Sequence, residues 1–381
     1  MIYNEFKGLQ LSDFGFDTRR LPVLDQDDSV IDEVHAKKMI DYAIDHGVNY
    51  FETAYDYHGG TAEAFLGRAL SKYDRNSYFL ADKFPGYELK NMPRYEEIFE
   101  KQLKDCQTDY FDFYILHNVD ELNIDSYLSK DNHVMEYLIE QKEKGRIRHL
   151  GIHSNGKCTT IERFLNVFGE HIEFAQIQLN YLDWTLIGAK DRVEYLRRRG
   201  LPIWATGPLR NGQLTKIEKS YEDTLRMFRP NETPAGWAYR FVQSTAAVKT
   251  ILSGISSMKQ LEEDLKIFEG DITLLNGKEA AILMTLVDDA LSRRLINCTA
   301  CHNCTEYCHH RLEIPTLIDL YNEYKFTKST EFITRPWSSI PVDKRPSSCA
   351  GCGACEKVCP NHIKVSEIMK ELSGIMASCS K

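Results

Sequence analysis

The sequence lacks the features that mark membrane, secreted and nucleic-acid-binding proteins. None of its apolar runs is long enough to span a bilayer. Residues 1–5 do not show the basic-then-apolar pattern of a secretion signal. Positive charge is not in excess either, since 47 Lys and Arg against 56 Asp and Glu leave a net charge of −9. We therefore expect a cytoplasmic protein whose partners include neither membranes nor nucleic acids.

A glycine fingerprint after a first strand is also missing, which argues against a doubly wound dinucleotide-binding sheet, the main rival fold. Short apolar runs instead alternate with helical apolar faces along some 250 residues, as in a (β/α)8 TIM barrel of class α/β. Eight strands are expected, at or near residues 9–16, 50–51, 78–83, 111–117, 149–152, 174–179, 202–206 and 250–253.

The composition changes after this repeating pattern ends. We predict a barrel over residues 1–275 and, over residues 276–381, a linker helix followed by a small, mainly α-helical domain. The linker helix is expected to start near Asn276 and Glu279, which have the spacing of a helix cap.

Four polar residues fall at or just beyond the ends of three predicted strands: Glu52, Tyr57, Lys83 and His117. In a barrel of this kind, the carboxyl ends of the strands carry the chemistry. An acid, a tyrosine, a lysine and a histidine suit carbonyl reduction. The tyrosine donates the proton, an adjacent ammonium lowers its pKa, a carboxylate holds the ammonium, and the histidine orients the carbonyl. Each residue alone has an ordinary structural explanation, but the set predicts a catalytic site.

These residues and their surroundings resemble the aldo-keto reductase family from about residue 9 to residue 270. The matching stretches are residues 47–54, Tyr57, residues 109–112 leading into His117, residues 145–152 and residues 207–214. The resemblance implies a barrel that binds NADP(H) or NAD(H) without a Rossmann domain. It also implies Tyr57 as proton donor, Lys83 as the residue that tunes it, and His117 as the residue that orients the carbonyl.

The resemblance further implies three groups of cofactor-binding residues. They are Ser154, Asn155 and Gln176 for the carboxamide, Thr206, Pro208 and Leu209 after the seventh strand, and Ser253, Gly254, Lys259 and Gln260 for the adenosine-side phosphate. This chain departs from the family pattern at three positions. Glu52 replaces an aspartate, and Gln260 replaces an arginine. Thr206 replaces a tyrosine that stacks on the nicotinamide, so the nicotinamide lacks its usual aromatic neighbour unless Trp204 or a loop supplies one.

Eight of the 11 cysteines lie in two runs with the same spacing, C-x2-C-x2-C-x3-C, which is that of two-cluster ferredoxins. Structural zinc, the alternative, uses separated ligand pairs and fits less well. Because the fourth cysteine of each run reaches the other cluster, two sets of [4Fe–4S] ligands are expected. They are Cys298, Cys301, Cys304 and Cys359 in one set, and Cys349, Cys352, Cys355 and Cys308 in the other. This half resembles the helical type of ferredoxin domain.

Together the two halves predict an NAD(P)H-dependent oxidoreductase that interconverts a small-molecule carbonyl and an alcohol. Its two clusters either exchange electrons with a separate one-electron redox partner or stabilise the fold. A nicotinamide passes two electrons as a hydride and a cluster passes one, a gap that flavins usually bridge. A flavin-bridged electron-transfer protein is therefore the second hypothesis, although no flavin signature is present. A redox sensor that binds NAD(P)H without turnover is the third.

Overall fold

The computed structural model describes the chain apart from residues 271–272, 297, 299–300, 339 and 380–381, and it does not describe the side chains of residues 294, 331–332, 335 and 379. The chain divides into two compact units, Met1–Leu283 and Met284–Lys381. The division falls within one helix, α12 (Gly277–Arg294). The predicted domain boundary after residue 275 precedes this helix and stays a prediction.

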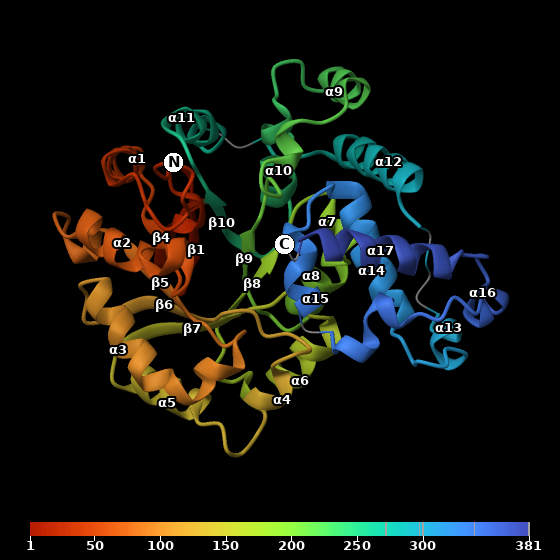
Figure 1. The fold of residues 1–381 in the computed structure, drawn as a ribbon. Coiled ribbons are helices and arrows are strands. Elements are labelled where there is room, and N and C mark those ends of the chain that lie inside the picture. The colour runs from red at the N-terminus through yellow and green to blue at the C-terminus, as the bar shows by residue number, and fades with distance from the viewer. Residues whose placement is uncertain (271–272, 297, 299–300, 339, 380–381) are drawn as a thin grey trace. The chain divides into compact units, whose positions relative to one another are not determined.

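The first unit is built on a closed barrel of eight parallel strands (Figure 1). Each strand pairs with the next along the chain, and β10 pairs with β3 to close the ring. The barrel strands are β3 (Phe14–Asp17), β4 (Tyr50–Glu52), β5 (Phe79–Phe84), β6 (Phe111–Leu116), β7 (Ile147–His153), β8 (Phe174–Gln178), β9 (Ile203–Thr206) and β10 (Val248–Gly254). The predicted (β/α)8 barrel is confirmed.

A helix follows each barrel strand. These helices are α1 (Glu33–Asp45), α2 (Ala62–Leu70), α3 (Tyr95–Asp105), α5 (Val134–Glu143), α6 (Cys158–Phe168), α8 (Ala189–Arg198), α10 (Pro234–Gln243) and α11 (Met258–Ile267). Three short helices lie in the loops: α4 (Ile124–Tyr127), α7 (Asp183–Leu186) and α9 (Lys219–Arg226). Local signals explain several starts. For example, the Thr233 hydroxyl accepts a hydrogen bond from the Gly236 N–H at 2.9 Å, and Pro234 occupies the first turn of α10.

The amino-terminal segment forms a hairpin arm that runs into the first barrel strand, as predicted, but the arm begins before the predicted residues 9–16. It forms a separate two-stranded hairpin, β1 (Tyr3–Phe6) and β2 (Leu9–Ser12), before β3 begins at Phe14. Phe6 of this hairpin packs against Trp204 and Phe113, with ring centroids 5.0 and 5.9 Å apart. The Trp204 ring thus packs inside the barrel near the strand starts, against the aromatic rings that close this end. It therefore does not face the carboxyl ends of the strands, as stacking on a nicotinamide would require.

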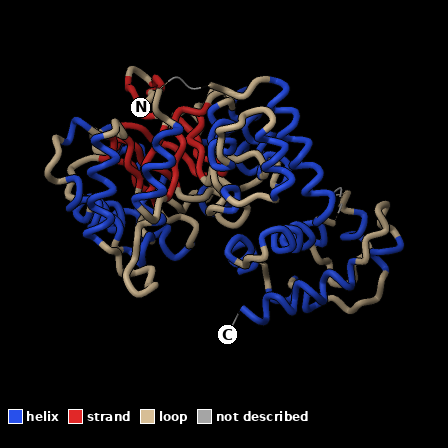
Figure 2. Tube along the Cα trace, turned by 90° about the horizontal axis from the view of Figure 1, so that it is seen from above, coloured by secondary structure: helices blue, strands red, loops and turns tan. Residues whose placement is uncertain are grey.

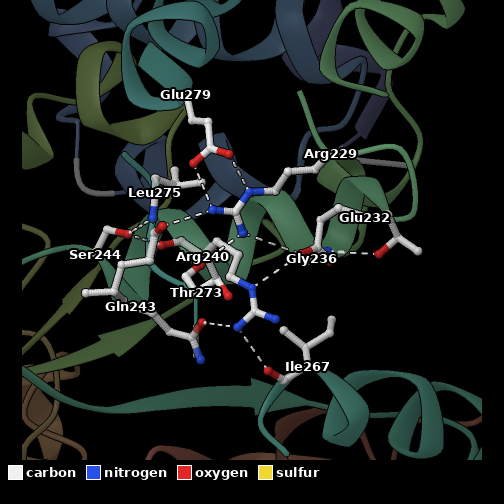
Figure 3. A network of polar contacts seen from close by, with 12 residues as sticks. Arg229, Glu232, Gly236, Arg240, Gln243, Ser244, Ile267, Thr273, Leu275 and Glu279 are labelled. Carbon is white, nitrogen blue, oxygen red and sulfur yellow. Dashed lines mark hydrogen bonds and ion pairs between the residues drawn. The ribbon is translucent and has the colours of Figure 1, made fainter. Parts of the chain in front are cut away.

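The start of α12 is held by a capping box. The Asn276 side-chain oxygen accepts from the Lys278 and Glu279 N–H groups at 2.9 and 3.1 Å, and Glu279 accepts from the Asn276 N–H at 2.9 Å. Figure 3 shows Glu279 facing Arg229, whose Nε and Nη2 donate to its two carboxylate oxygens at 2.8 Å each. This two-pronged ion pair ties the first turn of α12 to the segment before α10. The predicted start of the linker helix is confirmed.

In its described part the second unit contains helices and loops but no strand (Figure 2). Besides the end of α12, its helices are α13 (Asn303–Glu306), α14 (Ile314–Thr327), α15 (Glu331–Ser338), α16 (Ala354–Lys357) and α17 (Val365–Cys379). Apolar side chains of α14 and α17 form its core together with Cys304 and Cys355, and Cys298, Cys308, Cys349 and Cys359 pack against it. No helix in the described residues is long and apolar enough to cross a membrane.

Candidate active site and cysteine cavities

A polar group lies at the carboxyl-terminal mouth of the barrel. Glu52 is the last residue of β4, Lys83 is one residue from the end of β5, and His117 directly follows β6. Tyr57 begins the 3-10 turn η2 (Tyr57–Gly60), which follows β4. Because the strands are parallel, their ends meet on one face of the barrel, and side chains that are far apart in the sequence become neighbours.

Direct contacts join three of the four residues. Lys83 Nζ donates to the Tyr57 hydroxyl at 2.8 Å and lies 2.5 Å from Glu52 Oε1. All three side chains are buried, with exposed fractions of 6% for Tyr57, 2% for Lys83 and 0% for Glu52. The extra methylene of Glu52, compared with the family aspartate, therefore does not prevent an ion pair with Lys83.

Gln176 of β8 completes this chain of contacts from across the mouth. Its side-chain nitrogen donates to both Glu52 oxygens, at 3.0 and 2.7 Å. Its side-chain oxygen is buried and has no hydrogen-bond partner in the described part of the chain. A buried acceptor without a partner costs free energy, so this oxygen is a ready contact for a ligand that carries N–H donors.

The electrostatic surroundings keep Tyr57 protonated. Burial is the largest cause that raises the pKa of Tyr57, and the carboxylates of Asp17 and Glu52 raise it further, while Lys83 lowers it. The Lys83 ammonium thus lowers the pKa of Tyr57, as predicted from the sequence, but the net pKa is raised because burial outweighs the ammonium. For Lys83, burial lowers the pKa, but Glu52 and Tyr57 raise it more, so its net pKa is raised. Burial raises the pKa of Glu52, and the Lys83 ammonium opposes that rise.

His117 stands among aromatic rings at the same mouth. Its ring centroid lies 6.2 Å from that of Tyr57, 5.0 Å from that of Tyr87 and 5.5 Å from that of His153. His153 ends β7 next to Gln176 of β8. The sequence analysis did not single out His153, although β7 ends in a histidine just as His117 follows β6. Strand alternation, which puts His149, Gly151 and His153 on one side, was the available signal.

The residues expected to bind the carboxamide of the cofactor are only partly together. Ser154 is buried, and its hydroxyl donates to the Val119 carbonyl at 2.6 Å. Asn155 is exposed, and its backbone N–H donates to the Asn118 side chain at 3.3 Å. The Gln176 side-chain nitrogen instead donates to both carboxylate oxygens of Glu52. His153, the last residue of β7, is therefore the one whose ring faces His117, whereas Asn155 lies beyond the end of the strand.

The other expected cofactor residues follow β9 and β10, at the same end of the barrel. Thr206 ends β9 and is half-buried, and Pro208 and Leu209 lie in the loop after it. Ser253 and Gly254 end β10, and the Tyr239 hydroxyl donates to Ser253 Oγ at 2.9 Å.

The first turn of α11, which follows β10, presents one lysine and a glutamine whose side chain is already hydrogen-bonded. Lys259 is exposed and lies 3.8 Å from Glu263. The Gln260 side chain turns back, and its oxygen accepts from the Ser256 N–H and hydroxyl at 3.1 and 2.9 Å. Lys259 is therefore the side chain of this pair that remains extended toward solvent.

The loop after β9 is braced by a buried ion pair that the sequence analysis also missed. Arg210 Nε lies 2.9 Å from Asp183 Oδ1, and both side chains are almost fully buried. Asn180 donates to the Gly207 carbonyl at 3.0 Å and to Asp183 at 2.6 Å. These contacts join the loops after β8 and β9. They hold the second loop in a conformation in which Arg210 has φ 48°.

The cysteines of the second unit line two separate cavities. Cys308, Cys349, Cys352 and Cys355 line one, and Cys298, Cys301, Cys304 and Cys359 line the other. Each cavity thus combines three cysteines from one run with the last cysteine of the other run. Among the described residues, no three His, Cys, Asp or Glu side chains converge in a way that could hold a single metal ion.

Short local structures present these thiols. Cys304 lies in α13, which follows His302 with φ 59°, and Cys355 lies in α16, which follows Gly353 with φ 67°. Burial raises the pKa of Cys355 to about 11 and also raises that of Cys304. Both are therefore thiols at neutral pH unless a metal displaces the proton. Cys106 and Cys158 belong to the barrel unit and line neither cavity.

Comparison with known proteins gives two family matches. Residues 23–281 match the aldo/keto reductase family, and residues 297–363 match a 4Fe–4S dicluster domain. An uncharacterized oxidoreductase, YqkF of Bacillus subtilis, is 25% identical over 264 residues, which are 61% of this chain and 81% of that protein.

Solved structures share the fold of the barrel. The holo form of the aldo-keto reductase AKR11C1 from Bacillus halodurans has a TM-score of 0.61 and 23% identity, over 75% of this chain and 96% of that one. An aldo/keto reductase from Klebsiella pneumoniae, in complex with NADP and acetate, has a TM-score of 0.59 and 20% identity, over 74% and 93%. The matched family model covers more than half of the residues. The chain is therefore an oxidoreductase of the aldo/keto reductase family that carries a carboxyl-terminal 4Fe–4S domain.

Proposed function

We propose that the barrel interconverts a carbonyl and an alcohol on a small molecule by NAD(P)H-dependent hydride transfer. The observation that carries this proposal is the buried chain of contacts from Gln176 through Glu52 and Lys83 to Tyr57, with His117 beside the tyrosine. A phenol held by an ammonium is a suitable acid for a carbonyl oxygen.

In the direction of reduction, the Tyr57 hydroxyl gives its proton to the carbonyl oxygen as the carbonyl carbon is reduced. The phenolate that remains is stabilised by the Lys83 ammonium at 2.8 Å. Glu52 holds the ammonium in place, and Gln176 holds Glu52. His117 orients the carbonyl. Because the pKa of Tyr57 is raised, the hydroxyl carries its proton at neutral pH, and the Lys83 ammonium, which lowers that pKa, favours its transfer. Oxidation of the alcohol needs the phenolate and should therefore increase with pH.

The mouth offers contacts that fit a nicotinamide dinucleotide. The unpartnered Gln176 oxygen can accept from a carboxamide N–H, and Ser154 and Asn155 lie at the end of the neighbouring strand. When bound, the reduced cofactor supplies the hydride. We assign Thr206, Pro208, Leu209, Ser253 and Gly254 to the same ligand, with Lys259 beside its adenosine-side phosphate. The bound NADP named for the Klebsiella pneumoniae protein supports this assignment.

We further propose that each cysteine cavity holds one [4Fe–4S] cluster. Four thiols per cavity, three of them from one tight run, match the ligand set of such a cluster. Bound clusters would pass single electrons. We therefore propose a one-electron redox partner in addition to the small-molecule substrate.

The test is an anaerobic titration of the purified holoprotein with NADPH and, separately, NADH, followed by addition of carbonyl compounds. Nicotinamide oxidation that depends on the carbonyl supports the proposed reaction. Cofactor binding without turnover on any carbonyl contradicts it and favours a redox sensor.

Bleaching of the iron–sulfur absorbance before carbonyl addition shows electron flow to the clusters. Flavin released on denaturation then identifies a flavin-bridged electron-transfer protein.

A further inference from the structure

Arg19 has no part in the contacts from Gln176 through Glu52 and Lys83 to Tyr57, yet it lies over Tyr57, the proposed proton donor. Arg19 belongs to the 3-10 turn η1 (Thr18–Arg20) that directly follows β3, and its guanidinium carbon lies 5.3 Å from the centroid of the Tyr57 ring. The turn is fixed at its start, because the Asp17 carboxylate accepts the Arg19 backbone N–H at 3.0 Å. The position of Arg19 at the mouth is therefore determined by the end of a barrel strand.

The Arg19 guanidinium keeps its hydrogen-bond donors available. The residue is exposed, and its side chain makes no hydrogen bond or ion pair within the described part of the chain. Arg210 at the same end of the barrel differs, because its guanidinium is buried against Asp183. An arginine fork that is open to solvent at a reaction site is suited to a planar anion, which it can bind through two parallel hydrogen bonds.

Three acids lie near Arg19 and have to be considered as competitors. Burial lowers the pKa of Arg19, but Tyr57, Asp56, Asp17 and Asp28 raise it by more, so the residue remains a cation. Asp17 is engaged by the turn. Asp28 is 71% exposed and lies 3.4 Å from His58 Nδ1. An anion that binds Arg19 therefore has to contact the guanidinium directly to compete with these acids.

The geometry relates this cation to the reacting group. Arg19 lies over the Tyr57 ring, with its guanidinium carbon 5.3 Å from the centroid, and His117 approaches the same ring from another element. A substrate whose carbonyl oxygen accepts the Tyr57 proton would therefore bind close to the guanidinium, which could pair with a carboxylate bonded to the carbonyl carbon. A neutral substituent at that position would leave the guanidinium unpaired.

We propose that Arg19 recognises a carboxylate next to the reacting carbonyl, so that the substrates are 2-oxo acids and, in reverse, 2-hydroxy acids. This inference rests on the proposed carbonyl reduction and narrows its substrate class.

The test compares pyruvate with methyl pyruvate, which has the same carbonyl but no charge. In the wild-type holoprotein, kcat/KM for pyruvate should exceed that for the ester. In Arg19→Met this ratio should fall roughly 10- to 100-fold, the range of one lost charge-assisted contact, and Arg19→Lys should recover part of it. Arg68→Met is the matched control. It removes an arginine that pairs with Glu33 on the outer helices, and the ratio should stay unchanged.

A second measurement does not depend on turnover. Calorimetric binding of oxamate, a carboxylate beside an amide carbonyl, should weaken by a similar factor in Arg19→Met. Turnover of both carbonyls without preference for pyruvate, or an unchanged ratio in Arg19→Met, overturns the inference and leaves the proposed function standing. Equal loss for both substrates together with weaker NADPH binding also overturns it, because Arg19 would then serve the cofactor. Absence of all carbonyl turnover contradicts the proposed function, and oxamate binding still decides the role of Arg19.

Discussion

The barrel mouth and the cysteine cavities are organised in opposite ways. At the mouth, the polar side chains come from different strands and hold one another, as the contacts of Lys83 with Tyr57 and Glu52 show. In the second unit, each cavity is lined by cysteines from two short runs, and its deeper thiols stay protonated because of burial. The mouth is therefore preorganised by the protein, whereas the cavities would take their charge and final geometry from the clusters proposed to bind there.

The comparison can first be tested by removing one proposed cluster while the mouth stays intact. Cys355→Ser takes a buried ligand from the cavity that Cys308 also lines. Iron content and visible absorbance should fall to about half, because each cavity has its own ligand set. Cys158→Ser, in the barrel helix α6, is the control and should retain all iron. Full iron content in Cys355→Ser would contradict two independent clusters.

The reverse experiment disables the mouth and leaves the clusters intact. Tyr57→Phe removes the proton donor, so kcat/KM for a carbonyl should fall by about 10²- to 10⁴-fold, the usual contribution of a positioned acid. Iron content should not change. Tyr55→Phe is the matched control, because Tyr55 lies against Lys101 on the helix side, with Nζ 5.3 Å from the ring. Equal activity in the two variants would remove Tyr57 from the mechanism.

The preorganisation itself can be tested through Glu52. Glu52→Gln leaves the Lys83 ammonium buried without its counter-charge, which should lower the free energy of unfolding by about 3–5 kcal/mol. Adding Lys83→Met should restore much of the loss, since no buried charge then remains. Chemical denaturation of the single and double variants measures both. If the double variant is no more stable than Glu52→Gln, the ion pair does not organise the mouth.

The smallest expected effect concerns the opposite end of the barrel, where charges serve stability and not chemistry. Glu173 pairs with Lys7 at 2.5 Å and with His149 at 3.0 Å. Burial raises its pKa, but His149, Lys142 and Lys7 lower it more, so the net pKa is lowered. The stabilisation is present above the ordinary pKa of a glutamate and is lost as the pH falls through the lowered value.

Glu173→Gln should therefore cost about 1 kcal/mol at neutral pH, after discounting for solvent screening, and nothing in strong acid. Urea midpoints measured across acid pH give this difference, and carbonyl turnover should be unaffected. A difference between variant and wild type that grows as the pH falls would contradict the sign.

Much of this structure could be predicted because its signals are local. Apolar runs and helical faces identified the barrel strands, with errors of only a few residues, as at β7, which begins at Ile147. The hairpin β1–β2 begins earlier than the hairpin arm predicted over residues 9–16, because its pairing depends on a turn at Lys7 and Gly8, both with positive φ. His153 and Arg19 were missed because their importance comes from neighbours on other elements.

The sequence by itself determined the alternation of strands and helices, the acid, tyrosine, lysine and histidine near the strand ends, and the spacing of the cysteines. These are properties of short windows, which set local conformation and ligand reach. Only the tertiary structure decided which side chains share the mouth. Closure of the barrel brings Gln176 to Glu52 across 124 residues of chain and places Arg19 over Tyr57. Burial, which appears only when the barrel closes, then raises the pKa of that tyrosine above its ordinary value.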